Sequence, residues 1–215
     1  LIFVILGVHE MGHKIACEFD GISATMPYFI PGPPPYGTFG AVILQREFPV
    51  NRDELFDLGI SGPLAGFIAT VFVAFLSLQL SFLVPTAQVE QWLSMGYVSS
   101  LPMPPLLILI SMLRPTPPGF ELVYSPIFAA AWLGAFVTYL NLLPIWQLDG
   151  GHIIRAVGGR KYHKILSIAF LAFLFVTGMF LMAIILLLLG ALGGFEHAGP
   201  LDDVSPLSTS RKLLF

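Results

Sequence analysis

Charged residues are scarce in this sequence. Only 11% of its 215 residues are Asp, Glu, Lys or Arg, whereas 56% are hydrophobic. Soluble domains carry about 25% charged residues, so this chain has too few charges to cover a surface that faces water. We therefore expect an α-helical polytopic membrane protein that lies in a lipid bilayer. The net charge of −3 is small and gives no support for a nucleic-acid partner.

Cysteine is nearly absent. Cys17 is the single cysteine, so no disulfide can form within the chain, and the fold does not depend on an oxidising compartment. The first residues also show neither the charged n-region nor the small-residue cleavage site of a secretory signal peptide. Because the sequence begins at Leu1 inside an apolar run, we expect it to be an N-terminally truncated fragment of a longer chain.

The most informative motif is the H-E-x-x-H element in the apolar run at the start of the chain. On a helix, residues four apart share a face, so His9 and His13 can direct imidazole nitrogens at one ion. Zinc accepts such nitrogens and needs a third protein ligand and an open position for catalysis. Glu10 follows the first ligand and can act as the general base. The alternative is a chance match, or two buried histidines satisfied by neighbouring helices.

Proline and glycine are abundant, with 18 and 21 residues, and indicate broken helices and structured loops. Residues 26–36 are too rich in proline to form a helix. The following residues 37–45 are apolar and β-branched between glycines, which predicts one or two strands. A strand near an intramembrane metal site needs protein or a water-filled cavity around its backbone. Its edge could pair with an extended peptide, although an ordinary surface hairpin is equally compatible with the sequence.

Three stretches are predicted to span the bilayer. Residues 62–84 carry no charge and are long enough to cross. Residues 127–146, interrupted by Pro144, and residues 165–189 are the second and third spans. The short apolar stretch 106–113 lies between prolines and is predicted to be interfacial or re-entrant. We expect a membrane-embedded core over residues 1–192 and a polar, irregular C-terminal tail over residues 193–215.

Basic residues predict the orientation. If each apolar run crosses once, the loop after the histidine helix and the loop after the second span share one side. That side holds seven basic residues, namely Lys14, Arg46, Arg52, Arg155, Arg160, Lys161 and Lys164. The opposite side holds Arg114, Arg211 and Lys212. We therefore expect the side with seven to be cytoplasmic and the site residues to lie toward it.

Asp149 is the best candidate for the third metal ligand. It ends an uncharged span and stands beside glycines that allow close backbone approach. Asp149 could instead cap the helix that follows, and His152 is a rival ligand. Asn141, near the end of the same span, could donate a hydrogen bond to a substrate carbonyl or a developing oxyanion. Alternatively, Asn141 makes a structural bond between helices.

Four segments carry a family resemblance. They are H-E-M-G-H at 9–13, G-T-F-G at 37–40, S-G-P-L-A-G at 61–66 and N-L-L-P-I-W-Q-L-D-G at 141–150. In this order they resemble the site-2 proteases, the intramembrane zinc metalloproteases of peptidase family M50. The resemblance implies that Asp149 is the third zinc ligand, that Glu10 is the base, and that Asn141 holds the substrate or stabilises the intermediate. It also implies that residues 37–44 form a short re-entrant β element near the zinc site.

The sequence departs from the family in three respects. The family's helix upstream of the histidine helix is absent, Gly66 stands where the family often has Asn, and there is no room for an inserted PDZ domain. The form of the 37–40 and 61–66 motifs is most similar to archaeal and plastid-type members.

The function implied by this resemblance is Zn²⁺-dependent hydrolysis of peptide bonds within or near transmembrane segments of membrane-protein substrates. The enzyme would be a multi-pass metalloendopeptidase with its active site toward the cytoplasmic side. Two other functions remain open at this point. One is a catalytically silent homologue that binds membrane proteins. The other is a metal transporter that uses His9, His13 and Asp149, although the internal repeats typical of transporters are not evident and Glu10 would have no clear role.

Overall fold

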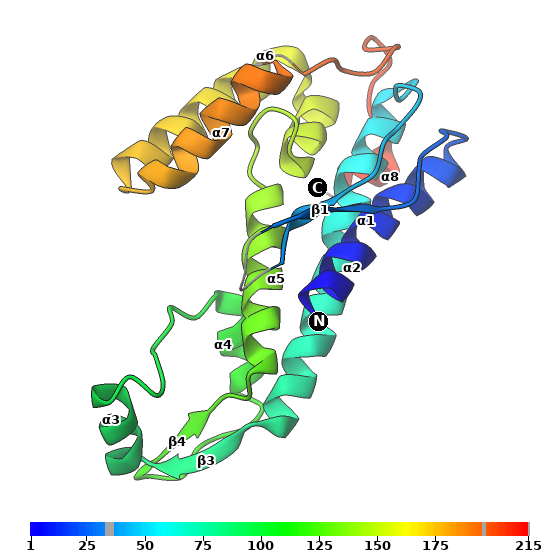
Figure 1. Ribbon diagram of the computed structural model, residues 1–215. Helices are drawn as coiled ribbons and strands as arrows, with labels where there is room; N and C mark the ends of the chain where they lie inside the picture. The colour runs from blue at the N-terminus through cyan, green and yellow to red at the C-terminus, as the bar shows by residue number, and fades with distance from the viewer. Residues whose placement is uncertain (33–36, 195–196, 215) are drawn as a thin grey trace. The chain divides into compact units, whose positions relative to one another are not determined.

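The computed structural model describes residues 1–32, 37–194 and 197–214 (Figure 1). The chain is mostly helical and contains two small antiparallel sheets. Its helices are α1 (Ile2–Phe19), α2 (Arg52–Leu80), α3 (Thr86–Ser94), α4 (Pro105–Ser111), α5 (Ile127–Asn141), α6 (Asp149–Val176), α7 (Phe180–Gly193) and α8 (Thr209–Lys212). Its strands are β1 (Tyr28–Pro31), β2 (Thr38–Val42), β3 (Phe82–Pro85) and β4 (Phe120–Val123).

Two compact units make up the chain. The first unit comprises residues 1–6 and 66–138, and the second comprises residues 7–65 and 139–215. All candidate site residues belong to the second unit. The predicted division into a core over residues 1–192 and a tail over residues 193–215 stays a prediction.

Among the described helices, α2 is the one that is long and apolar enough to cross a membrane. It begins at Arg52, before the predicted span at residue 62, because Asn51 caps it: the Asn51 Oδ1 accepts a hydrogen bond from the Glu54 N–H at 2.9 Å. At the other end, Arg114 donates to the carbonyls of Leu78 at 2.7 Å and Ser81 at 2.6 Å. These bonds satisfy carbonyl groups that a helix end leaves without partners. That several segments cross the bilayer stays a prediction.

The first unit packs α4 and α5 against α2. Its buried core contains Ile5, Val73, Ala74, Leu107 and Ala131. Short helix α4 overlaps the apolar stretch 106–113, and its Leu107 is buried with 1% of its surface exposed. That this stretch is interfacial or re-entrant stays a prediction. Strands β3 and β4 form an antiparallel pair that follows α2.

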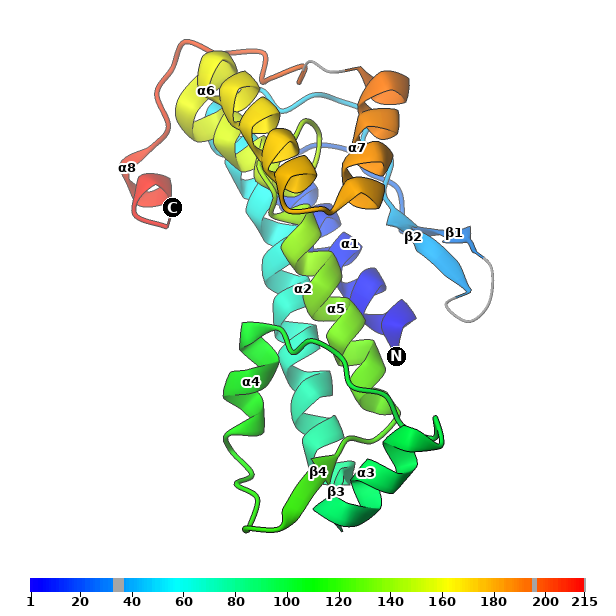
Figure 2. The same ribbon diagram turned by 90° about the vertical axis from the view of Figure 1, so that its left-hand side faces the viewer.

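The second unit holds the β1–β2 hairpin, in which Phe29 pairs with Ala41 (Figure 2). The predicted strand within residues 37–45 is confirmed by β2. Its partner β1 was missed, because it comes from the proline-rich stretch that we expected only to be non-helical. Residues 33–36 of that stretch lie outside the described residues. Whether the hairpin is re-entrant stays a prediction.

The predicted span over residues 165–189 is wrong as a single helix. Helix α6 ends at Val176, and α7 begins at Phe180 and returns beside it (Figure 2). The break occurs at Gly178, which has φ 78°, a left-handed conformation that glycine adopts without a steric penalty. Leu174 of α6 and Ala183 and Leu186 of α7 pack into one buried cluster. The apolar run therefore forms a helical hairpin. The prediction that Arg211 lies on the side opposite to Arg52 is wrong for the same reason, since Arg211 pairs with Asp53 and Asp57 at the start of α2.

The second predicted span, over residues 127–146, is also shorter than expected. Helix α5 ends at Asn141, before Pro144, because proline has no N–H for the helix and clashes with the preceding turn. The chain then runs through an irregular segment to Asp149, the first residue of α6.

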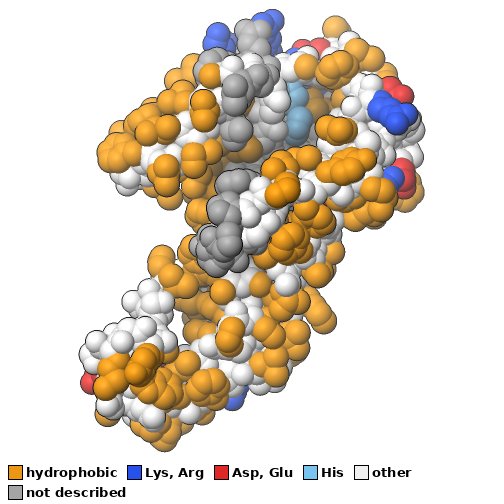
Figure 3. Space-filling view, in the orientation of Figure 1, with side chains coloured by type: hydrophobic (Ala, Val, Ile, Leu, Met, Phe, Trp, Pro, Cys, Tyr) orange, Lys and Arg blue, Asp and Glu red, His pale blue; other side chains and the backbone are white. Residues whose placement is uncertain are grey.

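Large apolar side chains are exposed in both units. On the face drawn in Figure 3, hydrophobic side chains predominate over charged ones. In the first unit Ile68 and Phe72 of α2 are 60% and 68% exposed, and in the second unit Leu181 of α7 is 74% exposed. Such surfaces are unusual on soluble monomers and are typical of contact with lipid or another protein.

Candidate metal centre

His9 and His13 lie on one face of α1, as the spacing predicted. Their Nε2 atoms are 3.2 Å apart, and both residues are buried, with 3% and 7% of their surface exposed. Among the described residues, one group of three candidate ligands has all its ligand atoms within 4.8 Å of one another: His9, Glu10 and His13. The H-E-x-x-H element therefore forms a compact cluster on a regular helix.

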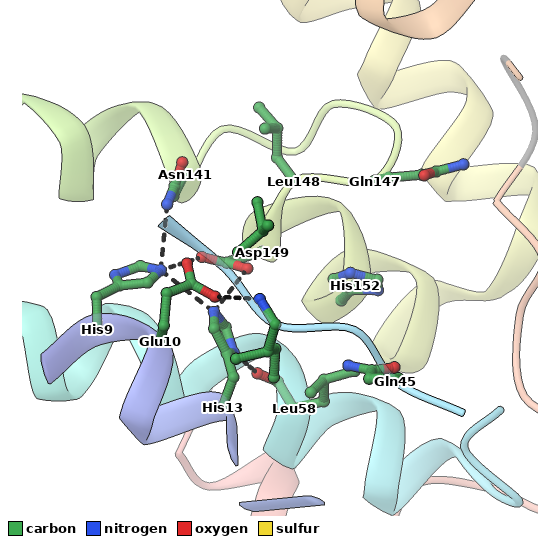
Figure 4. Close-up of a pocket in the computed structure, with 12 residues that line it drawn as sticks. His9, Glu10, His13, Gln45, Leu58, Asn141, Gln147, Leu148, Asp149 and His152 are labelled. Carbon is green, nitrogen blue, oxygen red and sulfur yellow. Dashed lines mark hydrogen bonds and ion pairs between the residues drawn. The ribbon is translucent and has the colours of Figure 1, made fainter. Parts of the chain in front are cut away.

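Asp149, the first residue of α6, lies next to His9 and His13 of α1 (Figure 4). Its Oδ2 lies 3.1 Å from the His9 Nε2, and its Oδ1 lies 3.3 Å from the His13 Nε2. Two atoms that bind a tetrahedral zinc at 2.0–2.1 Å are about 3.3–3.4 Å apart. The spacing of these three side chains is therefore close to the spacing that a shared zinc ion requires.

The hydrogen-bonding pattern also fits a cation. The Nδ1 of His13 donates to the Leu58 carbonyl at 2.8 Å, since a carbonyl can only accept; in the neutral ring, Nε2 then carries a lone pair. The Asp149 Oδ2 is buried and has no hydrogen-bond partner among the described residues. Electron-rich atoms thus face one another in a buried place, where an unpaired carboxylate oxygen is costly. A bound Zn²⁺ would satisfy them, so these residues fit the ion that the motif implies.

Glu10 lies beside the contacts of Asp149 with His9 and His13 and is held by a hydrogen bond of its own. Its Oε2 accepts a hydrogen bond at 3.1 Å from the N–H of Ile43, the residue that follows β2. Glu10 is partly buried and lines a cavity of about 200 Å³. The other lining residues are His9, His13, Val42, Ile43, Gln45, Leu58, Asn141, Gln147, Leu148, Asp149 and His152. A carboxylate at the cavity wall can exchange a proton with a molecule inside it.

Asn141 reaches the cluster from the last residue of α5. Its Nδ2 lies 3.2 Å from the Nε2 of His9, and it lines the same cavity (Figure 4). The structure therefore brings Asn141 to the place expected of a group that contacts a substrate. Its role there stays a prediction.

The irregular segment before Asp149 is fixed by two buried residues of α6. His163 donates from Nε2 to the Trp146 carbonyl at 2.8 Å. Ser167 accepts from the Trp146 N–H and donates to the Pro144 carbonyl, both at 3.1 Å. These bonds satisfy backbone groups that would otherwise be buried without partners, and they define how the chain enters α6 at Asp149.

Glycines allow the three helices of the site to approach closely. A Cβ added at Gly62 of α2 would overlap the imidazole ring of His13, and a Cβ at Gly12 of α1 would lie 2.5 Å from the Ser61 carbonyl oxygen. A Cβ at Gly59 would lie 2.9 Å from the Asp149 carbonyl oxygen of α6. The small residues Ser61 and Gly62 thus permit close packing of α1 and α2.

His152, the rival third ligand, is engaged elsewhere. It lies at the cavity wall, and its Nδ1 is 2.6 Å from the Nε2 of His197. The contacts to both histidines of α1 come from Asp149 instead. Sequence reasoning did not find His197, the Leu58 carbonyl or the Ile43 N–H, because backbone groups and long-range pairs leave no local pattern.

Comparison with known proteins agrees with this centre. The family model for peptidase family M50 matches residues 1–185. The chain is 31% identical over 187 residues to the protein named "Probable zinc metalloprotease EGY2, chloroplastic" of Oryza sativa subsp. japonica, covering 82% of this chain and 32% of the relative. It is 28% identical over 171 residues to "Probable zinc metalloprotease EGY1, chloroplastic" of Arabidopsis thaliana, covering 75% and 30%.

An archaeal relative is also found. The chain is 26% identical over 162 residues to "Zinc metalloprotease MJ0392" of Methanocaldococcus jannaschii, covering 75% of this chain and 34% of the relative. This chain belongs to peptidase family M50, the site-2 protease family. It spans about a third of the length of the relatives it matches.

The substitution Gly62→Ala should weaken zinc binding, because the added methyl group would displace the His13 ring from the cluster. We expect the zinc affinity, measured by competition with a chelator in detergent solution, to fall about tenfold or more, as for other changes that misplace a ligand. Leu64→Ala is the control, since Leu64 is on the same helix and 54% exposed. Equal affinities for Gly62→Ala and wild type would contradict the packing of His13 on Gly62.

Proposed function

We propose that this chain is the catalytic core of an intramembrane zinc metalloprotease that hydrolyses peptide bonds within or near transmembrane segments of membrane-protein substrates. The observation that carries the proposal is the joint position of His9, His13 and Asp149 with Glu10 at the wall of one cavity. Membership of family M50 and the names of the relatives, which describe zinc metalloproteases, support the same chemistry.

His9, His13 and Asp149 would hold the ion, and the cavity provides the open side that a substrate needs. A zinc ion there would lower the pKa of a bound water and polarise a peptide carbonyl. Glu10 then acts as the base: it takes a proton from the attacking water and passes it to the leaving amine nitrogen. The Ile43 N–H fixes the Glu10 carboxylate toward this task.

Asn141 is proposed to hold the scissile carbonyl or to stabilise the negative charge that develops on its oxygen. An amide N–H at the cavity wall is a suitable donor for that oxygen. The contact with His9 supports the proposal, since it places the amide beside the metal ligands.

The Glu10→Gln variant tests the proposed function most directly. We expect detergent-purified wild type to cleave a generic single-span substrate, and Glu10→Gln to lose about 10²–10⁴-fold in rate while retaining zinc, because only the proton transfer is removed. Glu18→Gln is the matched control: Glu18 lies on the same helix, is exposed and contacts Lys14.

The other outcomes separate the alternatives. Zinc binding without cleavage by the wild type would favour the catalytically silent homologue. Zinc flux into liposomes that is unchanged in Glu10→Gln would favour the metal transporter. Absence of bound zinc in the wild type would contradict the protease and the metal transporter.

A substrate in the cavity has to be extended, because a helix hides its carbonyl groups in backbone hydrogen bonds. Strand β2 offers a template for it. Among the described residues, β2 pairs with β1 on one side only, and Val42 and Ile43 line the cavity. We propose that a stretch of the substrate pairs with the free edge of β2, as in other cases of strand addition.

Replacing Val42 with proline tests this pairing. Proline distorts the end of β2 and removes a backbone donor, so we expect Val42→Pro to reduce cleavage while zinc remains bound. Val42→Thr keeps the backbone and the side-chain shape and should cleave like the wild type. Unchanged cleavage by Val42→Pro would contradict pairing at this edge.

We also propose that the protein is an integral, multi-pass membrane protein whose active site lies toward the cytoplasm. Helix α2 and the exposed apolar side chains support the membrane location, and the basic residues support the orientation. In a Cys17→Ala background, a single cysteine at Lys161 should react with a membrane-impermeant maleimide from the cytoplasmic side. Reaction from the opposite side alone would contradict the orientation.

A further inference from the structure

The last described residues contact α2 and α6, two helices of the metal site. We call residues 197–214 the C-terminal strap (Figures 1 and 2). The N–H of Leu201 donates to the Pro49 carbonyl at 3.0 Å, and the N–H of Asp202 donates to the Val50 carbonyl at 2.7 Å. The strap lies beyond residues 1–185, which the family model matches.

Asp203 of the strap joins α2 to α6. Its two carboxylate oxygens accept hydrogen bonds at 2.8 and 2.7 Å from the guanidinium of Arg155 on α6. Arg52, at the start of α2, donates to the Asp203 carbonyl at 2.7 Å and lies 3.2 Å from its carboxylate. Such two-pronged arginine–carboxylate pairs fix both distance and direction.

Loss of the Arg155–Asp203 ion pair should destabilise the fold, because the Arg155 side chain is only 4% exposed. A buried cation that loses its counter-charge is strongly unfavourable. The hydrogen bonds from Arg155 hold the pKa of Asp203 below its usual range. Asp203 is therefore ionised at neutral pH. Its contribution to stability is complete above the pKa of an unfolded aspartate and is lost as the pH falls through the lowered pKa.

Other contacts of the strap bind the same two helices. Leu207 is 3% exposed and packs in a cluster with Leu55 and Phe56 of α2 and with Ile153 and Ala156 of α6. Arg211 pairs with Asp53 at 2.9 Å and with Asp57 at 2.5 Å, both on α2. The strap thus holds α2 and α6 by an apolar contact and by ion pairs.

The two helices supply different parts of the metal centre. On α2, Arg52 precedes Leu58, whose carbonyl orients the His13 ring. On α6, Arg155 follows Asp149, the proposed third ligand. A change in the distance between these helices would move Asp149 relative to His13, and outer groups that orient ligands commonly control metal affinity.

We propose that Asp203 is a positioning residue for the metal centre: by joining Arg52 to Arg155 it holds His13 and Asp149 at the spacing that one zinc ion requires. This inference rests on the proposed zinc site. It assigns the C-terminal strap a role in forming that site.

The test compares Asp203→Asn with Asp202→Asn in the full chain. Asparagine keeps the size of Asp203 but removes the charge that Arg155 needs. We expect the zinc affinity, measured by chelator competition, to fall about tenfold or more in Asp203→Asn. The visible absorption of the Co²⁺-substituted protein should also change, since it reports the ligand geometry. Asp202→Asn should keep the wild-type affinity and spectrum, because Asp202 accepts its bonds from Val204 and Ser205 of its own turn.

Two further variants keep the test decisive. Asp203→Glu retains the carboxylate and should restore part of the affinity. If Asp203→Asn does not fold, Arg52→Gln replaces it, since this change leaves the Arg155–Asp203 pair intact and should still weaken zinc binding. Folded Asp203→Asn or Arg52→Gln with wild-type affinity and Co²⁺ spectrum would overturn the inference, as would an equal loss in Asp202→Asn. A wild-type chain that binds no zinc would instead overturn the proposed function itself.

Discussion

Burial of two imidazoles and a carboxylate at one point is the constraint on which the second unit depends. His9, His13 and Asp149 come within 3.1–3.3 Å of one another, and the Asp149 Oδ2 has no hydrogen-bond donor among the described residues. Such an arrangement is unfavourable without a cation, and several neighbouring features maintain it. The Leu58 carbonyl holds the His13 ring, and the glycines of α1 and α2 let the helices come close enough for that contact.

In this arrangement, different elements hold the residues that would bind the ion and the residue that would transfer the proton. The side chains that would hold the ion come from α1 and α6, which are far apart in the sequence, whereas Glu10 is fixed by the end of β2. The hairpin, in which one edge of β2 is unpaired among the described residues, therefore also orients the base. A substrate paired with β2 would thus bring its backbone next to Glu10 and Asn141, so that recognition of an extended peptide and its hydrolysis depend on the same few residues.

Local patterns predicted the parts of the site that lie within one helix. The H-E-x-x-H spacing was sufficient for His9, Glu10 and His13. Asp149 was the better candidate from its place beside glycines at the end of an uncharged span, but only the resemblance to M50 proteins implied its role as a ligand, because residue spacing does not show which of two nearby side chains faces α1. The span predicted over residues 165–189 was wrong, since hydropathy does not register that Gly178 turns the chain. Strand β1 and the ion pairs of Asp203 were not predicted, because they depend on contacts between distant segments.

X-ray absorption spectroscopy of the purified wild-type chain, with metal analysis, would show whether His9, His13 and Asp149 bind zinc. We expect one zinc ion per chain, bound by two imidazole nitrogens and by oxygen from a carboxylate, with an open or water-filled position. A smaller imidazole contribution, or loss of the zinc ion, in His13→Ala would identify the site. A chain that binds no zinc, or that binds it with a sulfur ligand from Cys17, would contradict the account.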